Sequence, residues 1–325
     1  VNENGTTTLS GTITDIGRLD SHDVEINWND ANDTTDAHFD LPPIYTIDPA
    51  TGALTQQLGT TGQTSFNSTT EDSVLTITGV DTTSGEITFT VTHQYLDDGA
   101  SSAQPGDNGS AADVSNIVVN VTDDDLGAVQ ANAEISVTND APSLSVTAGD
   151  VSENGTTTLT GTITDIGRLD SHDVEINWND ANDTTDAHFD LAPIFTIDPD
   201  TGVLTQALFA GDSFASTTED SLLTITGVDT TSGEITFTVT HQYLDDGASS
   251  AQPGGNGSAA DVSNIVVNVT DDDLGAVQAN AEISVTNVAP SLIVAAGDVS
   301  ENCLLYTSPS PRDGTKDLVC RLLLE

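Results

Sequence analysis

Basic residues, cysteine, methionine and aromatic side chains are all scarce in this chain of 325 residues. Five Lys and Arg stand against 52 Asp and Glu, a formal net charge of −47. This charge excludes binding to nucleic acid, and to an anionic membrane through a basic patch. No apolar run approaches the roughly 18 residues of a membrane-spanning helix. Neither a signal peptide nor an initiator Met is present, which predicts that the natural N-terminus is missing.

The composition changes at residue 303. Residues 303–325 read CLLYTSPSPRDGTKDLVCRLLLE and contain both cysteines and three of the five basic residues. This segment resembles a translated adapter of short-read DNA sequencing and is expected to be a non-native tail. We therefore predict no disulfide and no metal site from Cys303 and Cys320. Residues 1–302 carry Arg18 and Arg168 as their only basic side chains.

The strongest pattern is an internal repeat. The opening VNEN returns as VSEN at residues 151–154 and again at 299–302. Residues 6–41 match 156–191 with one change, and residues 75–138 match 223–286 with one change. A unit of this length is a whole domain. We predict repeat 1 at residues 1–140, truncated at its N-terminus, repeat 2 at 141–288, and the start of a third repeat at 289–302.

Apolar and polar residues alternate along several short runs of each copy, which is the period of half-buried strands. The clearest runs are residues 9–13, 24–28, 75–77, 87–95, 117–121 and 129–137. Turn sequences such as Asp-Pro-Ala-Thr-Gly at 48–52 separate them, and no helical period is present. The sequence therefore predicts an all-β chain of tandem, immunoglobulin-like antiparallel β-sandwich domains.

Several of these segments resemble known repeat families. The strand that ends in Trp28, the VTHQY strand with His93 and Tyr95, and the VTDDDLG turn resemble the polycystic-kidney-disease-type (PKD) repeat. The YTIDPATGAL hairpin at 45–54, the Asn139-Asp140-Ala141-Pro142 junction and the Ser-Glu-Asn motif at 152–154 resemble cadherin repeats. Both families are immunoglobulin-like sandwiches. The resemblance implies tandem repeats of large bacterial surface proteins and adhesins.

Carboxylates and amides gather in the turns, where a hard cation can collect six to eight oxygens. We predict calcium as the cofactor, with four alternative groups of ligands. The first three follow strands, and the fourth lies at the junction of the copies. They are Asp30, Asn32, Asp33 and Asp36; Asp97, Asp98 and Asp107, with Asp245 and Asp246 in the second copy; Asp123, Asp124 and Asp125, with Asp271, Asp272 and Asp273; and Asn139, Asp140 and Glu153. Val288 replaces Asp140 at the second junction, which makes the junction group the weakest.

Other candidate chemistry is sparse. No histidine pair has metal-ligand spacing, so His93 is expected to be a packed, hydrogen-bonded residue. Trp28 is in phase with Val24 and Ile26 and is expected to anchor the core. G-x-S-x-G, H-E-x-x-H and a phosphate-binding loop are all absent, so no catalytic residue and no enzymatic activity are predicted.

The leading hypothesis for function is a spacer in a secreted or cell-surface adhesin of a bacterium, stiffened by calcium in the acidic turns. Its expected partners are the neighbouring repeats of the same chain, with no insertion into a membrane. A second hypothesis is a module that binds a glycan or a protein, for which the variable segment 42–74 is the candidate contact. A third is an accessory array of a secreted hydrolase.

Overall fold

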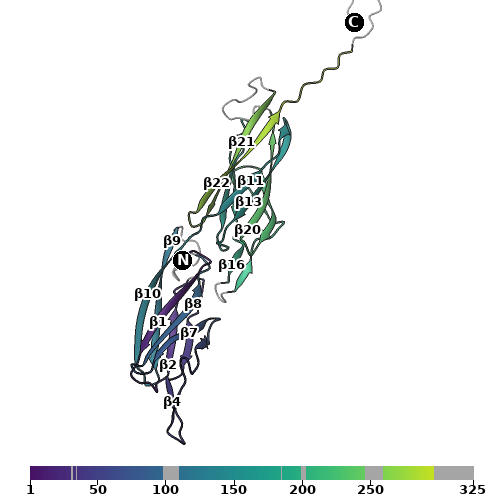
Figure 1. Cartoon of the computed structure of the whole chain (residues 1–325). Helices are drawn as coiled ribbons and strands as arrows, with labels where there is room; N and C mark the ends of the chain where they lie inside the picture. Colours follow the sequence, from purple (N-terminus) through teal and green to yellow (C-terminus); the bar gives the residue numbers. More distant parts are fainter. Residues whose placement is uncertain are drawn as a thin grey trace, which may run out of the picture. The chain divides into compact units, whose positions relative to one another are not determined.

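The computed structural model describes residues 1–30, 32–33, 35–97, 110–183, 185–198, 203–245 and 259–295. The chain divides into two units, Val1–Val288 and Ala289–Glu325. The first unit contains both complete repeats, and every regular element described in it is a β-strand (Figure 1). The described residues contain no helix that could span a membrane. Cys303, Cys320 and the rest of segment 303–325 lie outside the described residues.

Repeat 1 is built from two four-stranded sheets and a small hairpin. One sheet has the order β1-β8-β7-β6 and the other the order β10-β9-β2-β3, while β4 and β5 pair only with each other. The strands are β1 Thr6–Thr14, β2 His22–Asn27, β3 Ala37–Leu41, β4 Tyr45–Ile47, β5 Leu54–Gln56, β6 Ser65–Asn67, β7 Val74–Asp81, β8 Glu86–Gln94, β9 Ala112–Asp123 and β10 Ala128–Thr138.

Repeat 2 has the same two sheets, and each is extended by one strand. The orders are β11-β13-β20-β19-β18 and β12-β22-β21-β14-β15, with the separate hairpin β16-β17. The strands are β11 Ser143–Thr147, β12 Val151–Ser152, β13 Gly155–Thr164, β14 His172–Asn177, β15 Ala187–Leu191, β16 Phe195–Ile197, β17 Leu204–Gln206, β18 Ser213–Ala215, β19 Leu222–Asp229, β20 Glu234–Tyr243, β21 Ala260–Asp271 and β22 Ala276–Thr286.

The strand order confirms the predicted fold class. The first strand of repeat 2 is divided between the two sheets, since β11 pairs antiparallel with β13 and β12 pairs parallel with β22. Strands that are far apart in the sequence, such as β14 and β21, pair in the centre of one sheet. Two mainly antiparallel sheets joined by such long connections form an immunoglobulin-like sandwich.

The alternation of the sequence explains how each sheet buries one face. In β13, Leu159, Gly161 and Ile163 point inward and lie opposite Val239, Phe237 and Ile235 of β20. Gly161 is required by close packing, because a Cβ atom there would lie 2.2 Å from Cζ of Phe237. The intervening threonines face outward, where a β-branched side chain favours extended backbone.

The core is anchored at one end by Trp178, which is 2% exposed. Its carbonyl oxygen accepts hydrogen bonds from the hydroxyl groups of Tyr243 (2.8 Å) and Ser263 (2.7 Å). Trp28 is buried in the same way in repeat 1, and the predictions for Trp28 and for the 45–54 hairpin are both confirmed.

The domain boundaries remain a prediction. Repeat 2 has its own continuous hydrophobic core, and Leu144 and Val146 just after the boundary pack against it. We expect a fragment of residues 141–289 to unfold in one cooperative transition by circular dichroism. If this fragment is unfolded while residues 1–302 fold, the boundary or the independence of the repeats is wrong.

Candidate metal centre

The structure brings seven carboxyl groups together where repeat 1 is followed by repeat 2. Three overlapping sets of ligand atoms, each set within 4.8 Å, share Asp170. Repeat 1 contributes two of these groups, and the loops of repeat 2 contribute the others. They are Glu3, Asp97, Asp165, Asp170, Asp271, Asp272 and Asp273, which we call the junction cluster. Glu3, Asp170 and Asp273 are each only 1% exposed.

Turns at one end of repeat 2 hold most of the cluster. Asp165 follows β13, and its Oδ1 accepts a hydrogen bond from the amide of Gly167 (3.0 Å), while its Oδ2 lies 3.0 Å from Nε2 of His172. Asp271 ends β21, and its Oδ1 accepts from the amides of Asp273 (3.1 Å) and Gly275 (2.6 Å). These contacts fix the orientation in which both carboxylates face the cluster.

Repeat 1 closes the cluster through its first and last residues. The amide of Glu3 donates to the carbonyl of Thr138 (2.9 Å), so the start of the repeat lies beside its end. Oε1 of Glu3 then accepts from the amide of Asp140 (2.7 Å). Nδ2 of Asn139 donates to Oδ2 of Asp271 (2.9 Å), a direct bond between the repeats.

Several oxygens of the cluster have no protein partner. Both carboxylate oxygens of Asp170 and Oε2 of Glu3 are buried and accept no hydrogen bond from the described residues. The guanidinium of Arg168 is engaged elsewhere, since it donates to Oδ1 of Asn4 (2.8 Å) and to the carbonyl of Thr230 (3.0 Å). Buried carboxylates without partners are unfavourable unless a proton or a cation neutralises them.

The acidities of these groups reflect this environment. Burial raises the pKa of Glu3 to about 8, against the hydrogen bond from Asp140, and the neighbouring carboxylates Asp165, Asp97 and Asp271 raise it further. Burial also places the pKa of Asp170 far above its usual range, and the charges of Glu3 and Asp165 add to the shift. The cluster therefore takes up either protons or a cation.

The donor set fits calcium. All seven groups supply oxygen, the ligand that calcium prefers, and calcium accepts six to eight oxygens in flexible geometry. Such an ion would contact the buried oxygens of Asp170 and Glu3 that accept no hydrogen bond. No cysteine lies among the described residues, so a thiolate site for a softer metal is not available there.

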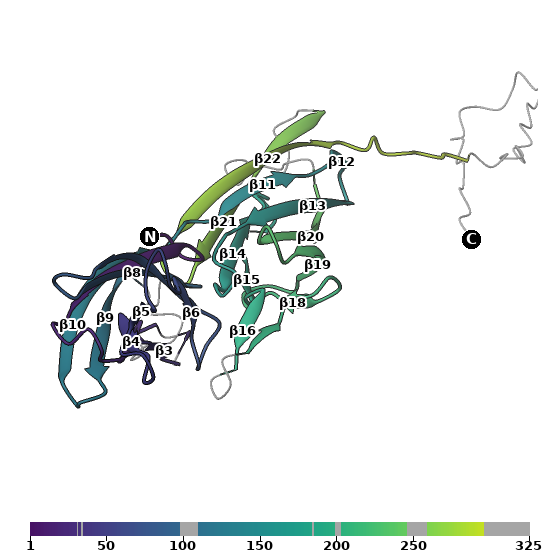
Figure 2. The same ribbon diagram turned by 60° about the horizontal axis from the view of Figure 1, so that its bottom comes forward.

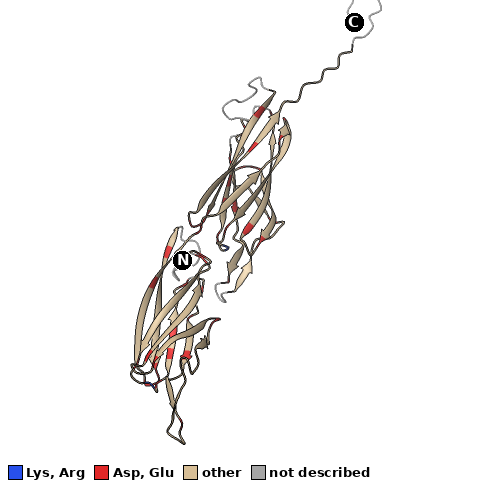
Figure 3. Ribbon diagram, viewed as in Figure 1, with Lys and Arg blue, Asp and Glu red and all other residues tan. Residues whose placement is uncertain are grey.

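Repeat 1 carries the same loops in a different environment. Asp15, Asp20 and Asp123 are the counterparts of Asp165, Asp170 and Asp271, and all three are half-buried rather than buried. Asp124 and Asp125 are exposed. Figure 3 marks acidic residues along the ribbon of both repeats, but in the described residues only those beside Glu3 and Asp97 gather into a buried cluster. The loops of repeat 2 are therefore buried because residues of repeat 1 cover them.

The other predicted ligand groups are arranged differently. Asp30 is buried with its Oδ2 2.9 Å from Nε2 of His93, and His93 stacks on Trp28 with ring centroids 4.6 Å apart. This confirms His93 as a packed, hydrogen-bonded residue. Oδ1 of Asp30 accepts from the amide of Asn32 (2.9 Å), which is a turn interaction. With Asp33 and Asp36, these residues form no set of three converging carboxylate or imidazole ligands within the described part of the chain.

The structure separates Glu153 from Asn139 and Asp140. Glu153 lies at the far end of repeat 2, where its Oε1 accepts from the amide of Val288 (2.9 Å). Asp140 makes the equivalent bond to Glu3 through its backbone, so the replacement of Asp140 by Val288 keeps the contact. Asp245 is half-buried at the position that Asp97 holds in repeat 1. Asp98, Asp107 and Asp246 lie outside the described residues.

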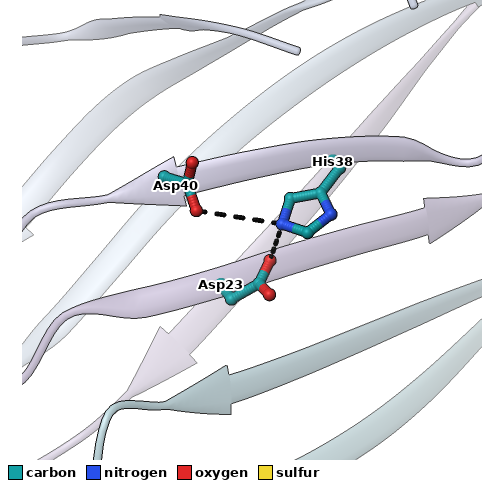
Figure 4. A group of neighbouring side chains, drawn as sticks. All are labelled: Asp23, His38 and Asp40. Carbon is teal, nitrogen blue, oxygen red and sulfur yellow. Dashed lines mark ion pairs between the residues drawn. The ribbon is translucent and has the colours of Figure 1, made fainter. Parts of the chain in front are cut away.

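A smaller acidic group lies on strands β2 and β3 of repeat 1 (Figure 4). Asp23 and Asp40 are cross-strand neighbours on β2 and β3, and Nε2 of His38 lies 2.6 Å from Asp23 and 3.8 Å from Asp40. Burial raises the pKa of Asp23, His38 opposes this shift, and Asp40 adds to it. The imidazole relieves the repulsion between two like charges that face each other across the strands. Asp173, His188 and Asp190 repeat this arrangement.

Sequence reasoning missed three members of the junction cluster: Glu3, Asp165 and Asp170. Glu3 could have been found from the repeat itself, because it is the counterpart of Glu153 and belongs to the same copy as Asn139. Asp165 and Asp170 stand in a loop with ordinary spacing, and only the fold brings them beside Asp271. No sequence signal distinguishes them from the other aspartates.

No family model and no curated protein matches the chain. Among solved structures, it is similar to the C-terminal domain of the AgI/II polypeptide BspA of Streptococcus agalactiae, with 8% identity over 88% of this chain and 94% of that one (TM-score 0.22). It is also similar to protocadherin gamma B2 extracellular cadherin domains 1–5, with 12% identity over 90% and 42% of the two chains (TM-score 0.22). The BSP domain of a biofilm associated protein is 12% identical over 87% and 56% (TM-score 0.20). These remote likenesses assign no function; the fold rests on the strand order.

Proposed function

We propose that this chain is a spacer segment of a large extracellular or cell-surface protein of the bacterial adhesin type, and that calcium in the junction cluster stiffens the connection between consecutive repeats. The observation that carries the proposal is the buried Asp170, whose two carboxylate oxygens have no partner among the described residues. The cluster combines Glu3 and Asp97 of repeat 1 with loops of repeat 2, so an ion there contacts both repeats at once.

The near-identity of the two copies favours a spacer. The two repeats are nearly identical outside residues 42–74 and 192–222, so neither copy is set apart as the binding domain. A spacer requires a fixed geometry between consecutive repeats rather than a ligand-binding pocket. Hydrogen bonds from Asn139 to Asp271 and from Arg168 to Asn4 connect the two repeats without an ion.

A ligand-binding module is the second candidate, and the β4-β5 hairpin favours it. This hairpin projects from the sandwich in Figure 1 and carries Ile47 and Leu54, which are 50% and 61% exposed. It lies in the segment that differs most between the copies. A glycan or protein ligand would contact this hairpin and its counterpart at Val203 and Leu204.

We expect calcium to narrow the distribution of distances between the two repeats. Spin labels at Leu54→Cys and Val262→Cys, with Cys303→Ser and Cys320→Ser, allow this distribution to be measured by double electron–electron resonance. Both labelled residues are exposed, so the labels leave the cores intact. With chelator the distribution is expected to be broad, and with calcium narrow.

Asp170→Asn tests whether the junction cluster is responsible. This variant is expected to remove most of the calcium response, because Asp170 belongs to every ligand set at the junction. Asp20→Asn, the matched change in repeat 1, is expected to retain it. A distribution that calcium leaves unchanged in the unsubstituted chain contradicts the stiffening.

A further inference from the structure

Each repeat carries a set of three ligand residues that shares no member with the junction cluster. Each set combines one histidine with two aspartates on a pair of neighbouring strands, and its three ligand atoms lie within 4.8 Å of one another. The sets are Asp23, His38 and Asp40 in repeat 1, and Asp173, His188 and Asp190 in repeat 2. An imidazole beside two carboxylates is a different donor set from the carboxylates of the junction.

The register of strands β2 and β3 brings the ligands of repeat 1 together. Asp23 lies directly opposite Asp40, and His38 precedes Asp40 by two residues, so the three side chains project from one face of the sheet. On the other face Val24 pairs with Phe39, and both are fully buried in the core. Because a slip of one residue would expose this apolar pair, the core fixes the positions of the ligands.

Hydrogen bonds from the loop between β6 and β7 hold the backbone of His38. Its amide donates to Oγ of Ser68 (3.1 Å), and its carbonyl oxygen accepts from the amide of Thr69 (2.9 Å). His188 is held by the same two bonds in repeat 2, where β14 and β15 lie side by side in Figure 2. The ligands therefore stand on paired strands with a supported backbone, which is the kind of scaffold that a metal site requires.

The imidazole directs Nε2 toward both carboxylates (Figure 4). Nε2 of His38 lies 2.6 Å from Oδ1 of Asp23 and 3.8 Å from Oδ1 of Asp40. Despite the shorter contact, Oδ1 of Asp23 is buried and accepts no hydrogen bond from the described residues, and the same holds for Oδ1 of Asp173. A buried carboxylate oxygen without a hydrogen bond is unfavourable unless a cation neutralises it.

The donors and their spacing fit zinc. Zinc binds imidazole nitrogen and carboxylate oxygen at about 2.0–2.2 Å, so two ligands in tetrahedral geometry lie roughly 3.3–3.6 Å apart. The distances of 2.6 Å and 3.8 Å from Nε2 of His38 lie on either side of this range, and small rotations of the side chains bring both into it. Calcium prefers six to eight oxygens, which one imidazole and two carboxylates do not supply.

We propose that each repeat binds one zinc ion through Nε2 of this histidine and the carboxylates of the two aspartates. The fourth position is open to water, because the side chains of His38 and Asp40 are 34% and 78% exposed. A divalent ion cancels the charges of both aspartates, which a single imidazolium cannot do. Glu25 lies opposite His38 on the same face, and its negative charge adds to the attraction for a cation.

Isothermal titration calorimetry with zinc chloride tests the proposal on the full chain. Cys303→Ser and Cys320→Ser remove competing thiolates, and millimolar calcium occupies the carboxylates of the junction cluster. We expect two zinc ions per chain, one for each set. His38→Ala and His188→Ala are each expected to remove one ion, and the two changes together to remove both. Both histidines are half-buried, and an unchanged melting curve verifies that the variants fold.

A pair of variants with matched charge separates ligation from general attraction. Asp40→Asn with Asp190→Asn removes one ligand from each set and is expected to weaken zinc binding by about tenfold or more. Glu25→Gln with Glu175→Gln removes the same charge from the same faces but no member of either set, and is expected to retain both ions.

Nuclear magnetic resonance of the six histidine rings identifies the ligands directly. Zinc is expected to shift the ring signals of His38 and His188 and to leave the other four unchanged. A chain that binds no zinc in the presence of calcium overturns the proposal, as does a shift of other rings that spares these two. Binding that survives the combined histidine changes, or that the Glu25 and Glu175 changes weaken as strongly as the aspartate changes, also overturns it.

Discussion

Replacing His241 by alanine is expected to destabilise repeat 2 by about 3–5 kcal/mol, the usual cost of leaving one member of a buried ion pair alone. Nε2 of His241 lies 3.0 Å from Oδ2 of Asp180, whose side chain is 1% exposed. The same imidazole stacks on Trp178 with ring centroids 4.6 Å apart. The substitution therefore removes the partner of a buried carboxylate and opens a cavity against the main core anchor.

The matched control is His188→Ala in the same repeat. His188 also pairs with an aspartate, at 2.6 Å from Asp173, but the two side chains are 35% and 43% exposed. Exposed pairs contribute at most about 1 kcal/mol, so this change is expected to be small. Urea unfolding of the full chain measures both variants, and repeat 1 with its unchanged His93 serves as an internal reference.

A double variant separates the charge from the cavity. Asp180→Ala in the His241→Ala background removes the carboxylate that was left alone, so the pair of changes is expected to cost less than the sum of the two single changes. Equal destabilisation by His241→Ala and His188→Ala contradicts the importance of the buried pair.

The fold class could be predicted from the sequence because the alternation and the turns that indicate it are local patterns. Alternation along residues 87–95 and 129–137 predicts which side chains face inward, and the structure places these segments in two different sheets, as β8 and β10. The hairpin at 45–54 follows from its turn sequence. Which strands become neighbours depends on contacts distant in sequence, as between β2 and β9, and no local pattern encodes those.

The candidate site was only partly predictable for the same reason. The turn with Asp271, Asp272 and Asp273 was recognised because consecutive aspartates are conspicuous. Its twin with Asp123, Asp124 and Asp125 has the same sequence but is not buried. Burial, and with it the raised pKa of Glu3 and Asp170, depends on a neighbouring repeat that covers one loop and not the other. Identical sequences cannot distinguish these two environments.

Calcium is expected to raise the melting temperature of the chain, and to do so more strongly at pH 8 than at pH 6. Without calcium, burial holds Glu3 protonated in the folded state up to its pKa of about 8, whereas the unfolded group loses its proton near 4.5. The folded state thus binds more protons between these two values, and stability falls as the pH rises through this window. With calcium, the ion neutralises the ionised carboxylates instead. Its binding releases protons, so its contribution grows with pH.

Differential scanning calorimetry at fixed, high ionic strength isolates the specific contribution of calcium from general screening. An ion that binds only the folded state and is present at a thousand times its Kd adds about 4 kcal/mol. Magnesium is expected to add much less, because it demands stricter geometry and dehydrates reluctantly. Equal melting temperatures in calcium and in chelator would contradict specific calcium binding. Salt would then only screen the charges of the acidic turns.

Asp170→Asn is expected to change the melting temperature in opposite directions under the two conditions. In chelator at pH 8 the neutral amide replaces a buried carboxyl group whose pKa is raised by burial and by the charges of Glu3 and Asp165, so folding no longer has to protonate this group and the melting temperature rises. In calcium the same change removes a ligand shared by all the ligand sets at the junction, and most of the stabilisation by the ion is lost. Asp20→Asn is the matched control, because Asp20 stands at the equivalent position of repeat 1 but outside this cluster. A general effect of lowering the net charge would act alike on both variants, whereas a calcium site at the junction makes only Asp170→Asn insensitive to the ion.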